Sequence, residues 1–352
     1  MSRRTMAAVA LAVPVALVAA AGPAGACGGL FGENGTIQLV KTTTLAAYTD
    51  GIERYVTAFE FSGEGESVGS IVPLPDVPTD VTAAGDWTLQ RLLQEVAPPS
   101  EARVGIAEEA SADDSGADVI LEAEIEALDV TVLRGGADEV GEWALDNGFL
   151  LTPDAPEVLD FYAQRSEVFM AARFNADRAR ELGTGAGEST SIMATIPTDD
   201  PWVPVRILGL GLDAEQDVQA DVFLLTEEEP EVLAGGDGMS LARSERASAV
   251  LLSDLRSDEN MSWVPRDMWL SYLTVDAPAS ELDYDLAVSA TPGEQPSLAD
   301  TGTLDERAAV EVPVAPDEGS RGVPVWPVVA GVGAALAVVA VGVGRVWGSA
   351  GR

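Results

Sequence analysis

Apolar and polar positions divide this chain of 352 residues into an apolar start, a long acidic middle and an apolar end. The first apolar run covers residues 6–21, follows Arg3 and Arg4, and is shorter than a membrane-spanning helix. The last run covers residues 325–344 and contains no charge. A helix of about twenty residues spans about 30 Å, the thickness of a hydrocarbon core. The pattern therefore predicts a secretory signal at one end and a transmembrane helix at the other.

The middle of the chain shows both helical and strand periodicity. Residues 37–61 alternate between apolar and polar positions, with Asp50 and Gly51 between the two halves. This arrangement is a strong signal for a hairpin with a two-residue turn. Residues 88–96 repeat leucine at helical spacing, which predicts a short amphipathic helix, and Asp86 is its predicted N-cap.

Further strands and two more helices follow from the same patterns. The apolar face of residues 120–133 changes near Leu128, which predicts either a bulge within that strand or a strand edge that emerges from solvent. Residues 140–147 and 158–163 have the spacing of two short helices. The other predicted strands cover residues 67–77, 120–133, 168–174, 191–196, 203–210, 218–225, 263–275 and 283–290.

These elements predict an α+β fold: a mainly antiparallel β-sheet ectodomain with a few short helices, plus one C-terminal transmembrane helix. The ectodomain forms either one unit or two halves. Residues 98–118 are predicted to be a mobile acidic loop. The predicted segments are a signal peptide (1–26), an extracytoplasmic α+β domain (27–290), a Pro/acid-rich stalk (291–324), a transmembrane helix (325–344) and a cytoplasmic tail (345–352). The stalk is expected to be mobile, because its proline, glycine and charge leave little apolar surface to bury.

The signal is expected to be cleaved after Ala24-Gly25-Ala26, where small residues stand at Ala24 and Ala26. Two further interpretations of this region are open. Ser2-Arg3-Arg4 resembles a twin-arginine export signal, although paired arginines are also ordinary in a secretory signal. Cys27 would be the first mature residue and a candidate for lipidation, but a lipidation motif usually has a larger aliphatic residue where this chain has Ala24.

Arginines after the last apolar run, with no acid among them, place the tail in the cytoplasm and the domain outside. The predicted localisation is a single-pass protein of the cell membrane. The pentapeptide Leu298, Ala299, Asp300, Thr301 and Gly302 resembles a sortase sorting signal, which would attach the chain to the cell wall instead. A charged stretch over residues 303–321 separates it from the apolar run, so a linker that carries this pentapeptide by chance is the favoured interpretation.

Composition excludes several classes of function. The chain has 58 acidic and 20 basic residues, and all the acids lie between the two terminal runs, so binding of nucleic acid through a basic patch is excluded. It has no histidine, which removes Ser-His-Asp and Cys-His catalysis and His-ligated metals. Its single cysteine cannot form an intramolecular disulfide. No cofactor and no metal site are predicted.

Several motifs, in order over about residues 27–290, resemble the bacterial domain-of-unknown-function family 2330. They are Ala26-Cys27-Gly28-Gly29, Phe59-Glu60-Phe61, Val72-Pro73-Leu74-Pro75, Leu128-Asp129-Val130-Thr131-Val132-Leu133, Trp143-Ala144-Leu145-Asp146-Asn147-Gly148-Phe149, Pro197, Trp202-Val203-Pro204-Val205-Arg206-Ile207 and Val222-Phe223-Leu224-Leu225. Many members carry a second cysteine soon after the first, and this chain has Phe31-Gly32 there. The resemblance implies no established activity and no site residues.

Acids beside proline or tryptophan at strand ends are the first candidates for chemistry. They are Asp199 and Asp200 before Pro201-Trp202, and Asp76 after Pro75. Burial there could perturb a pKa, but acids in solvent-facing turns are the favoured interpretation. Asp300-Thr301-Gly302 matches the aspartic-protease tripeptide, yet that chemistry needs two such loops. Arg206 interrupts an apolar strand, and pairing with a buried acid is favoured over anion binding.

The topology and the lack of histidine favour a non-enzymatic binding or structural module of the cell envelope. Its expected partners are the membrane, through the C-terminal span, and an envelope protein or wall component of unknown identity. The alternative is an extracytoplasmic hydrolase that uses carboxylates, with or without Ca²⁺ or Mg²⁺. A pocket with two or three convergent carboxylates would favour the enzyme.

Overall fold

The computed structural model describes residues 29–32, 42–60, 68–97, 118–182, 189–234, 236–290, 293–303 and 310–312. The chain separates into two compact units, Met1–Ala315 and Pro316–Arg352, and every described residue belongs to the first. The described residues form three sheets, with almost all neighbouring strands antiparallel, and a few short helices. The mixed α+β class with mainly antiparallel sheet is confirmed.

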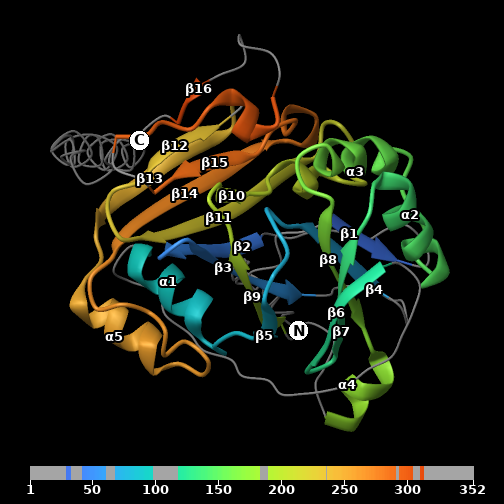
Figure 1. Ribbon diagram of the computed structural model, residues 1–352, viewed down its shortest axis with the longest axis horizontal. Coiled ribbons are helices and arrows are strands. Elements are labelled where there is room, and N and C mark those ends of the chain that lie inside the picture. The colour runs from blue at the N-terminus through green and yellow to red at the C-terminus, as the bar shows by residue number, and fades with distance from the viewer. Residues whose placement is uncertain are drawn as a thin grey trace, which may run out of the picture. The chain divides into compact units, whose positions relative to one another are not determined.

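The central sheet contains seven strands. They are Thr42–Thr49 (β2), Ile52–Glu60 (β3), Asp80–Ala83 (β5), Ser189–Pro197 (β9), Asp217–Thr226 (β11), Met239–Arg246 (β13) and Trp269–Pro278 (β14). Their order is β13-β14-β11-β2-β3-β9-β5, and β11 runs parallel to β2 (Figure 1). The predicted hairpin is β2–β3. Its turn residues Asp50 and Gly51 have φ of 52° and 72°, as a two-residue turn with two left-handed positions requires.

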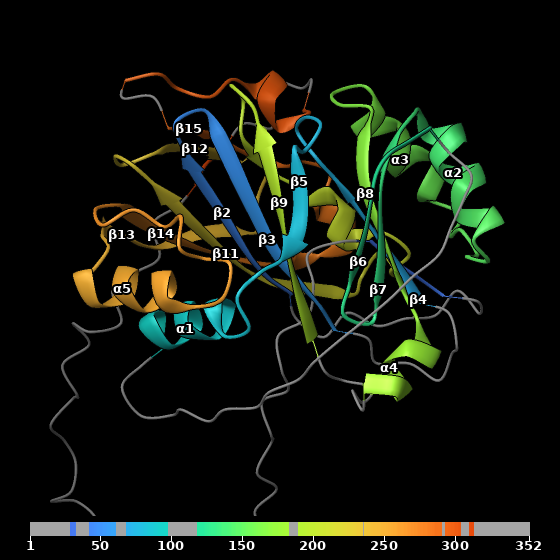
Figure 2. The ribbon, with the colours of Figure 1, turned by 60° about the horizontal axis from the view of Figure 1, so that its bottom comes forward.

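Two helices, α1 (Thr88–Val96) and α5 (Ala249–Ser257), cover one face of the central sheet (Figures 1 and 2). Leu45, Val56 and Phe223 of the sheet form one buried cluster with Leu92 of α1 and Leu255 of α5. Because strand residues alternate between faces, the next residues along each strand belong to the opposite face and to a second cluster.

A second sheet lies between the central sheet and two further helices (Figure 2). Its strands are Gly29–Gly32 (β1), Val68–Pro73 (β4), Asp118–Ile125 (β6), Leu128–Arg134 (β7) and Val168–Phe174 (β8), in the order β1-β4-β8-β7-β6. The helices are α2 (Ala137–Asp146) and α3 (Ala155–Ala163), both at predicted positions, and α4 (Ala176–Leu182) follows β8. Phe169 and Leu159 belong to the buried cluster that also contains Ile192 of the central sheet.

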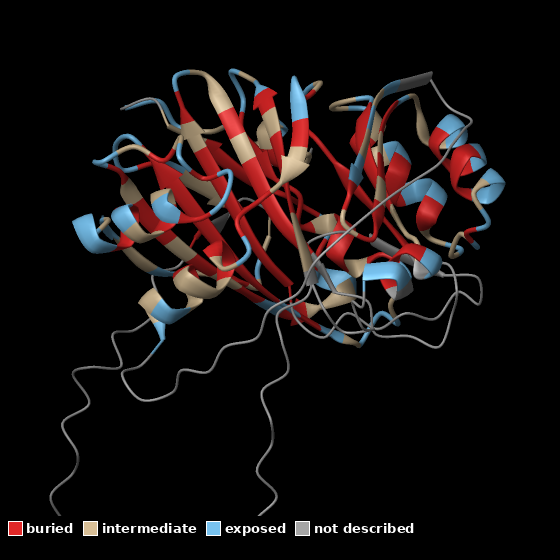
Figure 3. Ribbon diagram, turned by 90° about the horizontal axis from the view of Figure 1, so that it is seen from below, coloured by how far each residue is buried: buried red, intermediate tan, exposed pale blue. Residues whose placement is uncertain are grey.

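A third, four-stranded sheet packs on the same face of the central sheet. Its strands are Trp202–Val203 (β10), Glu231–Ala234 (β12), Leu286–Ser289 (β15) and Val310–Glu311 (β16), in the order β10-β15-β12-β16. Trp202 and Leu286 share the main cluster with Tyr55 and Leu224 of the central sheet. Figure 3 shows the resulting pattern, with buried strands inside and exposed helix faces and loops outside. Three 3-10 helices complete the fold: Arg206–Gly209 (η1), Ala279–Glu281 (η2) and Leu298–Thr301 (η3).

Three local predictions were wrong. Residues 120–133 form the hairpin β6–β7 rather than one bulged strand; Glu126 adopts φ of 50° at the turn, and the reversal of the chain explains the change of apolar face. The predicted strand over 203–210 ends at Val203 and turns into η1. Trp87, not Asp86, is the N-cap of α1. The start of α1 is held instead by distant Asp258, whose Oδ2 accepts hydrogen bonds from the Trp87 amide and the Thr88 hydroxyl at 3.2 and 2.7 Å.

No helix in the described ranges is long and apolar enough to cross a membrane. The predicted signal peptide, transmembrane helix and cytoplasmic tail lie outside the described residues, as does the acidic loop except for Asp118, which begins β6. The structure does describe part of the predicted stalk. Here it differs from the expectation of a mobile segment, because Thr301 and Val312 are buried and β16 pairs with β12. The contacts of the domain therefore continue beyond Ala290.

Candidate functional site

A cleft of about 460 Å³ lies where three connecting segments meet. Pro75 and Asp76 follow β4, residues 198–202 connect β9 to β10, and residues 294–300 lie beyond β15. Tyr48 at the end of β2 contributes one wall and donates a hydrogen bond to the Thr198 carbonyl at 3.0 Å. The cleft is thus built from residues that are far apart in the sequence and that strand ends bring together.

The three acids that the sequence marks as candidates, Asp76, Asp199 and Asp200, all line this one cleft. Glu294 and Asp300 join them. Asp76 is exposed and accepts a hydrogen bond from the Val77 amide at 2.7 Å, as expected of an acid in a solvent-facing turn. No group of three acids within the described ranges is placed so that it could hold a metal ion. The cleft therefore carries spread negative charge rather than a convergent carboxylate centre.

Among the described residues that line the cleft, Arg165 is the one cation, and its charge is already paired inside the protein. Its guanidinium forms an ion pair with Asp285, donates to the main-chain oxygen of Asp300, and lies over the Trp202 ring at 4.3 Å from the ring centroid. The Trp202 ring in turn stacks on Tyr162, with centroids 5.8 Å apart. Because Arg165 is committed to these partners, the surface that the cleft offers to a ligand is anionic.

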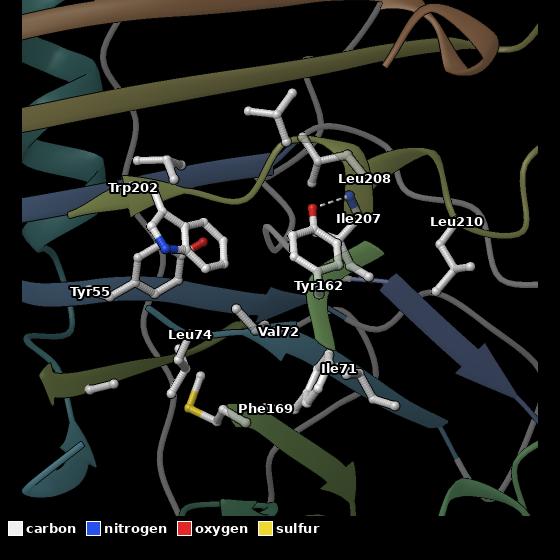
Figure 4. Close-up of a cluster of buried hydrophobic side chains, with 14 of the residues drawn as sticks. Tyr55, Ile71, Val72, Leu74, Tyr162, Phe169, Trp202, Ile207, Leu208 and Leu210 are labelled. Atoms are coloured by element: carbon white, nitrogen blue, oxygen red, sulfur yellow. Dashed lines mark hydrogen bonds between the residues drawn. The ribbon is translucent and has the colours of Figure 1, made fainter. Parts of the chain in front are cut away.

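Asp285 pairs with Arg165 of the cleft lining and holds the chain segment that follows β10. Its fully buried carboxylate accepts hydrogen bonds from the amides of Val205 and Arg206, at 2.7 and 3.2 Å, and from the Tyr162 hydroxyl at 2.8 Å. The Tyr162 oxygen also accepts from the Ile207 amide at 2.9 Å (Figure 4). These bonds explain why the chain leaves the strand after Val203 and turns into η1.

Burial controls the ionisation of this network. Burial raises the pKa of Asp285, while Arg165, the two amides and Tyr162 oppose the rise. Burial, followed by the charge of Asp285, raises the pKa of Tyr162 well above its usual value. Nearer the cleft, burial and then the negative charge of Asp199 raise the pKa of Tyr48. The tyrosine hydroxyls therefore stay neutral hydrogen-bond donors at neutral pH.

The pentapeptide that resembles a sorting signal forms part of the cleft wall. Leu298, Ala299, Asp300 and Thr301 make up η3, and Gly302 ends it with φ of 77°. The Thr301 side chain is buried and its carbonyl accepts from the Asp285 amide at 2.9 Å. Any enzyme that recognised this motif would first have to detach the turn from Arg165 and Asp285. The aspartic-protease tripeptide within it also lies in a packed turn.

Arg206 pairs with an acid, but the acid is exposed, whereas a buried acid was expected. Its guanidinium lies 2.6 Å from a Glu157 oxygen, and the Glu157 side chain is 81% exposed. The same guanidinium lies over the Phe161 ring at 4.5 Å from the ring centroid. Ala24, Ala26 and Cys27, the predicted cleavage and lipidation residues, lie outside the described residues.

Glu53 is a buried acid that sequence reasoning missed. It lies in β3 opposite Tyr48 and is fully buried, and neither carboxylate oxygen has a hydrogen-bond partner within the described structure. Burial raises its pKa to about 8, although the nearby main-chain amide of Trp202 lowers it to a smaller extent. The signal in the sequence was the alternation of β3, which places Glu53 on the same face as buried Tyr55.

The fold and the cleft define a class: a three-sheet α+β domain with an anionic cleft at the ends of its strands. The chain belongs to the family described as "Uncharacterized protein conserved in bacteria (DUF2330)", whose sequence profile matches residues 20–247. The match includes Glu53, Asp76, Asp199 and Asp200 and ends before Asp285. The resemblance inferred from sequence motifs is thereby confirmed.

Comparison with other proteins adds little beyond the family. No curated protein matches the chain. Among solved structures, the chain is similar to baculovirus P35, with 11% sequence identity, a TM-score of 0.34, and coverage of 75% of this chain and 96% of that one. It is also similar to a mutated baculovirus P35 after caspase cleavage, with 10% identity, a TM-score of 0.32, and coverage of 71% and 96%. At these TM-scores the likeness carries no argument about function.

Proposed function

We propose that this protein is a membrane-anchored, extracytoplasmic binding module whose cleft receives a basic segment of an envelope protein. The observation that carries the proposal is the lining of the cleft. Five acidic residues line an open volume of about 460 Å³, and the arginine among the described lining residues is committed to Asp285 and Trp202. A cationic ligand would gain Coulomb attraction there, and an anionic ligand would be repelled.

The shape and the aromatic content of the cleft suit a peptide. Tyr48 offers a ring surface on which a cationic side chain gains cation–π attraction, whereas the Trp202 ring is already covered by Arg165 and Tyr162. Pro75, Pro201 and Pro296 line the cleft as well, and proline fixes the backbone of a wall before the ligand arrives. The predicted export signal and apolar C-terminal run, which support the location outside the membrane, come from the sequence.

A carboxylate-dependent hydrolase is the second candidate, and one observation favours it. Glu53 has a pKa raised to about 8, as a general acid requires. However, Glu53 lies in a small cavity behind the cleft wall, and no second acid among the described residues lines that cavity to act with it. The acids that do line the cleft form no group of three within the described ranges that could hold a metal ion. The geometry therefore supports binding better than hydrolysis.

Titration of the purified chain with a capped Lys-Gly-Lys-Gly-Lys peptide tests the proposal. Replacing Asp199→Asn and Asp200→Asn together removes two charges from the cleft, and we expect binding to weaken roughly five- to tenfold. Isothermal calorimetry at low salt measures the affinity, and a capped Glu-Gly-Glu-Gly-Glu peptide is the negative probe.

The matched control replaces two exposed acids outside the cleft, Asp213→Asn and Glu215→Gln, with the same change in net charge. This variant should bind within about twofold of wild type, because neither side chain lines the cleft and both are exposed to solvent. Equal weakening in both variants would show that only net charge matters and would contradict a cleft site. If the wild type hydrolyses a wall glycan, and the Asp199→Asn, Asp200→Asn variant folds but has lost this activity, the hydrolase would replace the binding proposal.

A further inference from the structure

A second, much smaller cavity adjoins the cleft. Its volume is about 10 Å³, roughly the space that one water molecule occupies. Tyr48, Pro201, Trp202 and Val288 line both the cavity and the cleft, so these four residues separate the two spaces. Glu53 lines the cavity and not the cleft. The cavity is therefore a pocket behind the cleft wall with a carboxyl group in it.

The Glu53 carboxyl has no ion pair among the described residues, and the Trp202 amide that lowers its pKa does not reach hydrogen-bonding geometry. Buried polar side chains are almost always hydrogen-bonded, and buried charges are paired. Neither oxygen of Glu53 has a hydrogen-bond partner within the described residues, and no described arginine forms an ion pair with it. A cation that entered this cavity would supply the missing partner.

The groups that surround Glu53 are neutral or negative. Tyr48 faces it from β2, and its hydroxyl is neutral at neutral pH. Asp199 and Asp200 precede β10, and Glu227 follows β11; all three act on Tyr48 together with Glu53. The other elements at the cavity contribute Thr226 and apolar side chains. Arg165 lies over the Trp202 ring of the cavity wall, but its charge is paired with Asp285, so the net local field favours a cation over an anion.

The size of the cavity selects among cations. A primary ammonium group is about as large as a water molecule, whereas a guanidinium or a trimethylammonium group is several times larger. The Tyr48 ring in the wall favours a cation. The Thr226 hydroxyl already donates to the Glu228 carbonyl at 2.7 Å, which leaves its oxygen free to accept from an ammonium group.

We propose that the Glu53 cavity is the terminal pocket of the cleft and binds a primary ammonium group on an unbranched chain, such as a lysine side chain. This inference rests on the proposed function, because the rest of the ligand lies in the cleft. The unbranched alkyl chain of the ligand enters past Trp202 and Pro201. Its ammonium group pairs with the Glu53 carboxylate and fills the water-sized cavity.

Binding in this pocket has a proton consequence. With a pKa of about 8, Glu53 is protonated at pH 7, and pairing with an ammonium group ionises it. The proton goes to the buffer, so close to one proton is released per ligand at pH 7 and only about a tenth of one at pH 9. The affinity should rise about tenfold per pH unit below pH 8 and then level off, since the ammonium group itself stays charged up to about pH 10.

Calorimetry of the purified full chain in buffers of different ionisation enthalpy counts the released protons. The probes are a capped Gly-Lys-Gly peptide and 1-aminobutane, and the comparison probes are Gly-Arg-Gly and Gly-trimethyllysine-Gly. We expect Glu53→Gln to weaken lysine binding at least tenfold and to abolish proton release, and the two larger cations to bind at least tenfold more weakly than lysine. Tighter binding of the lysine peptide than of 1-aminobutane would identify a lysine side chain as the source of the ammonium group. Equal binding of the two would identify a small free amine. Both results support the pocket.

The outcomes separate this inference from the proposed function. If Glu53→Gln binds lysine as wild type does, or wild type releases no protons, the ammonium pocket is overturned while cleft binding stands. If wild type binds no cationic probe, both are overturned. Should Glu53→Gln fail to fold, infrared spectroscopy of wild type decides: the C=O stretch of a protonated carboxyl should disappear on adding the lysine peptide, and its persistence would overturn the pocket.

Discussion

Replacing Glu53→Gln is expected to stabilise the protein at alkaline pH and to leave its stability almost unchanged at pH 4. Glu53 has a pKa of about 8 in the folded chain and about 4.5 when unfolded. Between these values the folded state holds a proton that the unfolded state has lost, so rising pH favours unfolding. The stability that the protonated group contributes is fully present below pH 4.5 and is lost as the pH rises to about 8. The loss amounts to roughly 4–5 kcal/mol.

Urea unfolding of wild type and Glu53→Gln at several pH values between 4 and 9 measures this effect. The difference in unfolding free energy should grow by about 1.4 kcal/mol per pH unit above pH 4.5 and level off above pH 8, because glutamine does not ionise. Glu215→Gln is the matched control, since Glu215 is exposed, and its difference from wild type should stay within about 0.5 kcal/mol. A difference for Glu53→Gln that is constant across this range would contradict the buried, protonated state.

Replacing Asp285→Ala is expected to destabilise the protein by roughly 3–5 kcal/mol. The substitution leaves the Arg165 guanidinium, the Tyr162 hydroxyl and the amides of Val205 and Arg206 buried or half-buried without their acceptor. The same change should free the η3 turn, because Arg165 holds the Asp300 carbonyl only while Asp285 positions its guanidinium. Limited proteolysis should then cut within residues 293–303 before any other described segment.

Urea denaturation and mass spectrometry of the proteolytic fragments measure the two effects of Asp285→Ala. Asp283→Ala is the control, since Asp283 lies two residues away and is exposed. Its stability should stay within about 0.5 kcal/mol of wild type, and residues 293–303 should remain protected. A stable Asp285→Ala variant with an uncut η3 turn would show that other contacts hold this segment.

Local periodicity predicted most of the fold. The β2–β3 hairpin, α1, α2, α3 and β8 were visible because each carries its own turn signal or apolar spacing. The β6–β7 turn was not, because Glu126 adopts its positive φ without glycine. β13 was missed because its residues are mostly half-exposed and show no clean alternation, and α5 because its apolar face is short.

The cleft was partly visible for a similar reason. Asp76, Asp199 and Asp200 follow apolar strands beside proline, and strand ends from different parts of the chain meet at one edge of a sheet. Glu53 and Asp285 were not visible as buried acids. An acid in an alternating strand looks like a solvent-facing residue, and only the packing of the third sheet on the central sheet buries it.

The most direct test of the cleft as a binding site is to map where a basic peptide contacts the chain. Nuclear magnetic resonance of the ¹⁵N-labelled, purified chain, titrated with the capped Lys-Gly-Lys-Gly-Lys peptide, reports the site residue by residue. We predict that the shifted signals gather at the Trp202 indole, the amides of residues 198–200 and the amides of residues 294–300. Shifts confined to the face that α1 and α5 cover, or no shifts at millimolar peptide, would contradict the binding function proposed for the cleft.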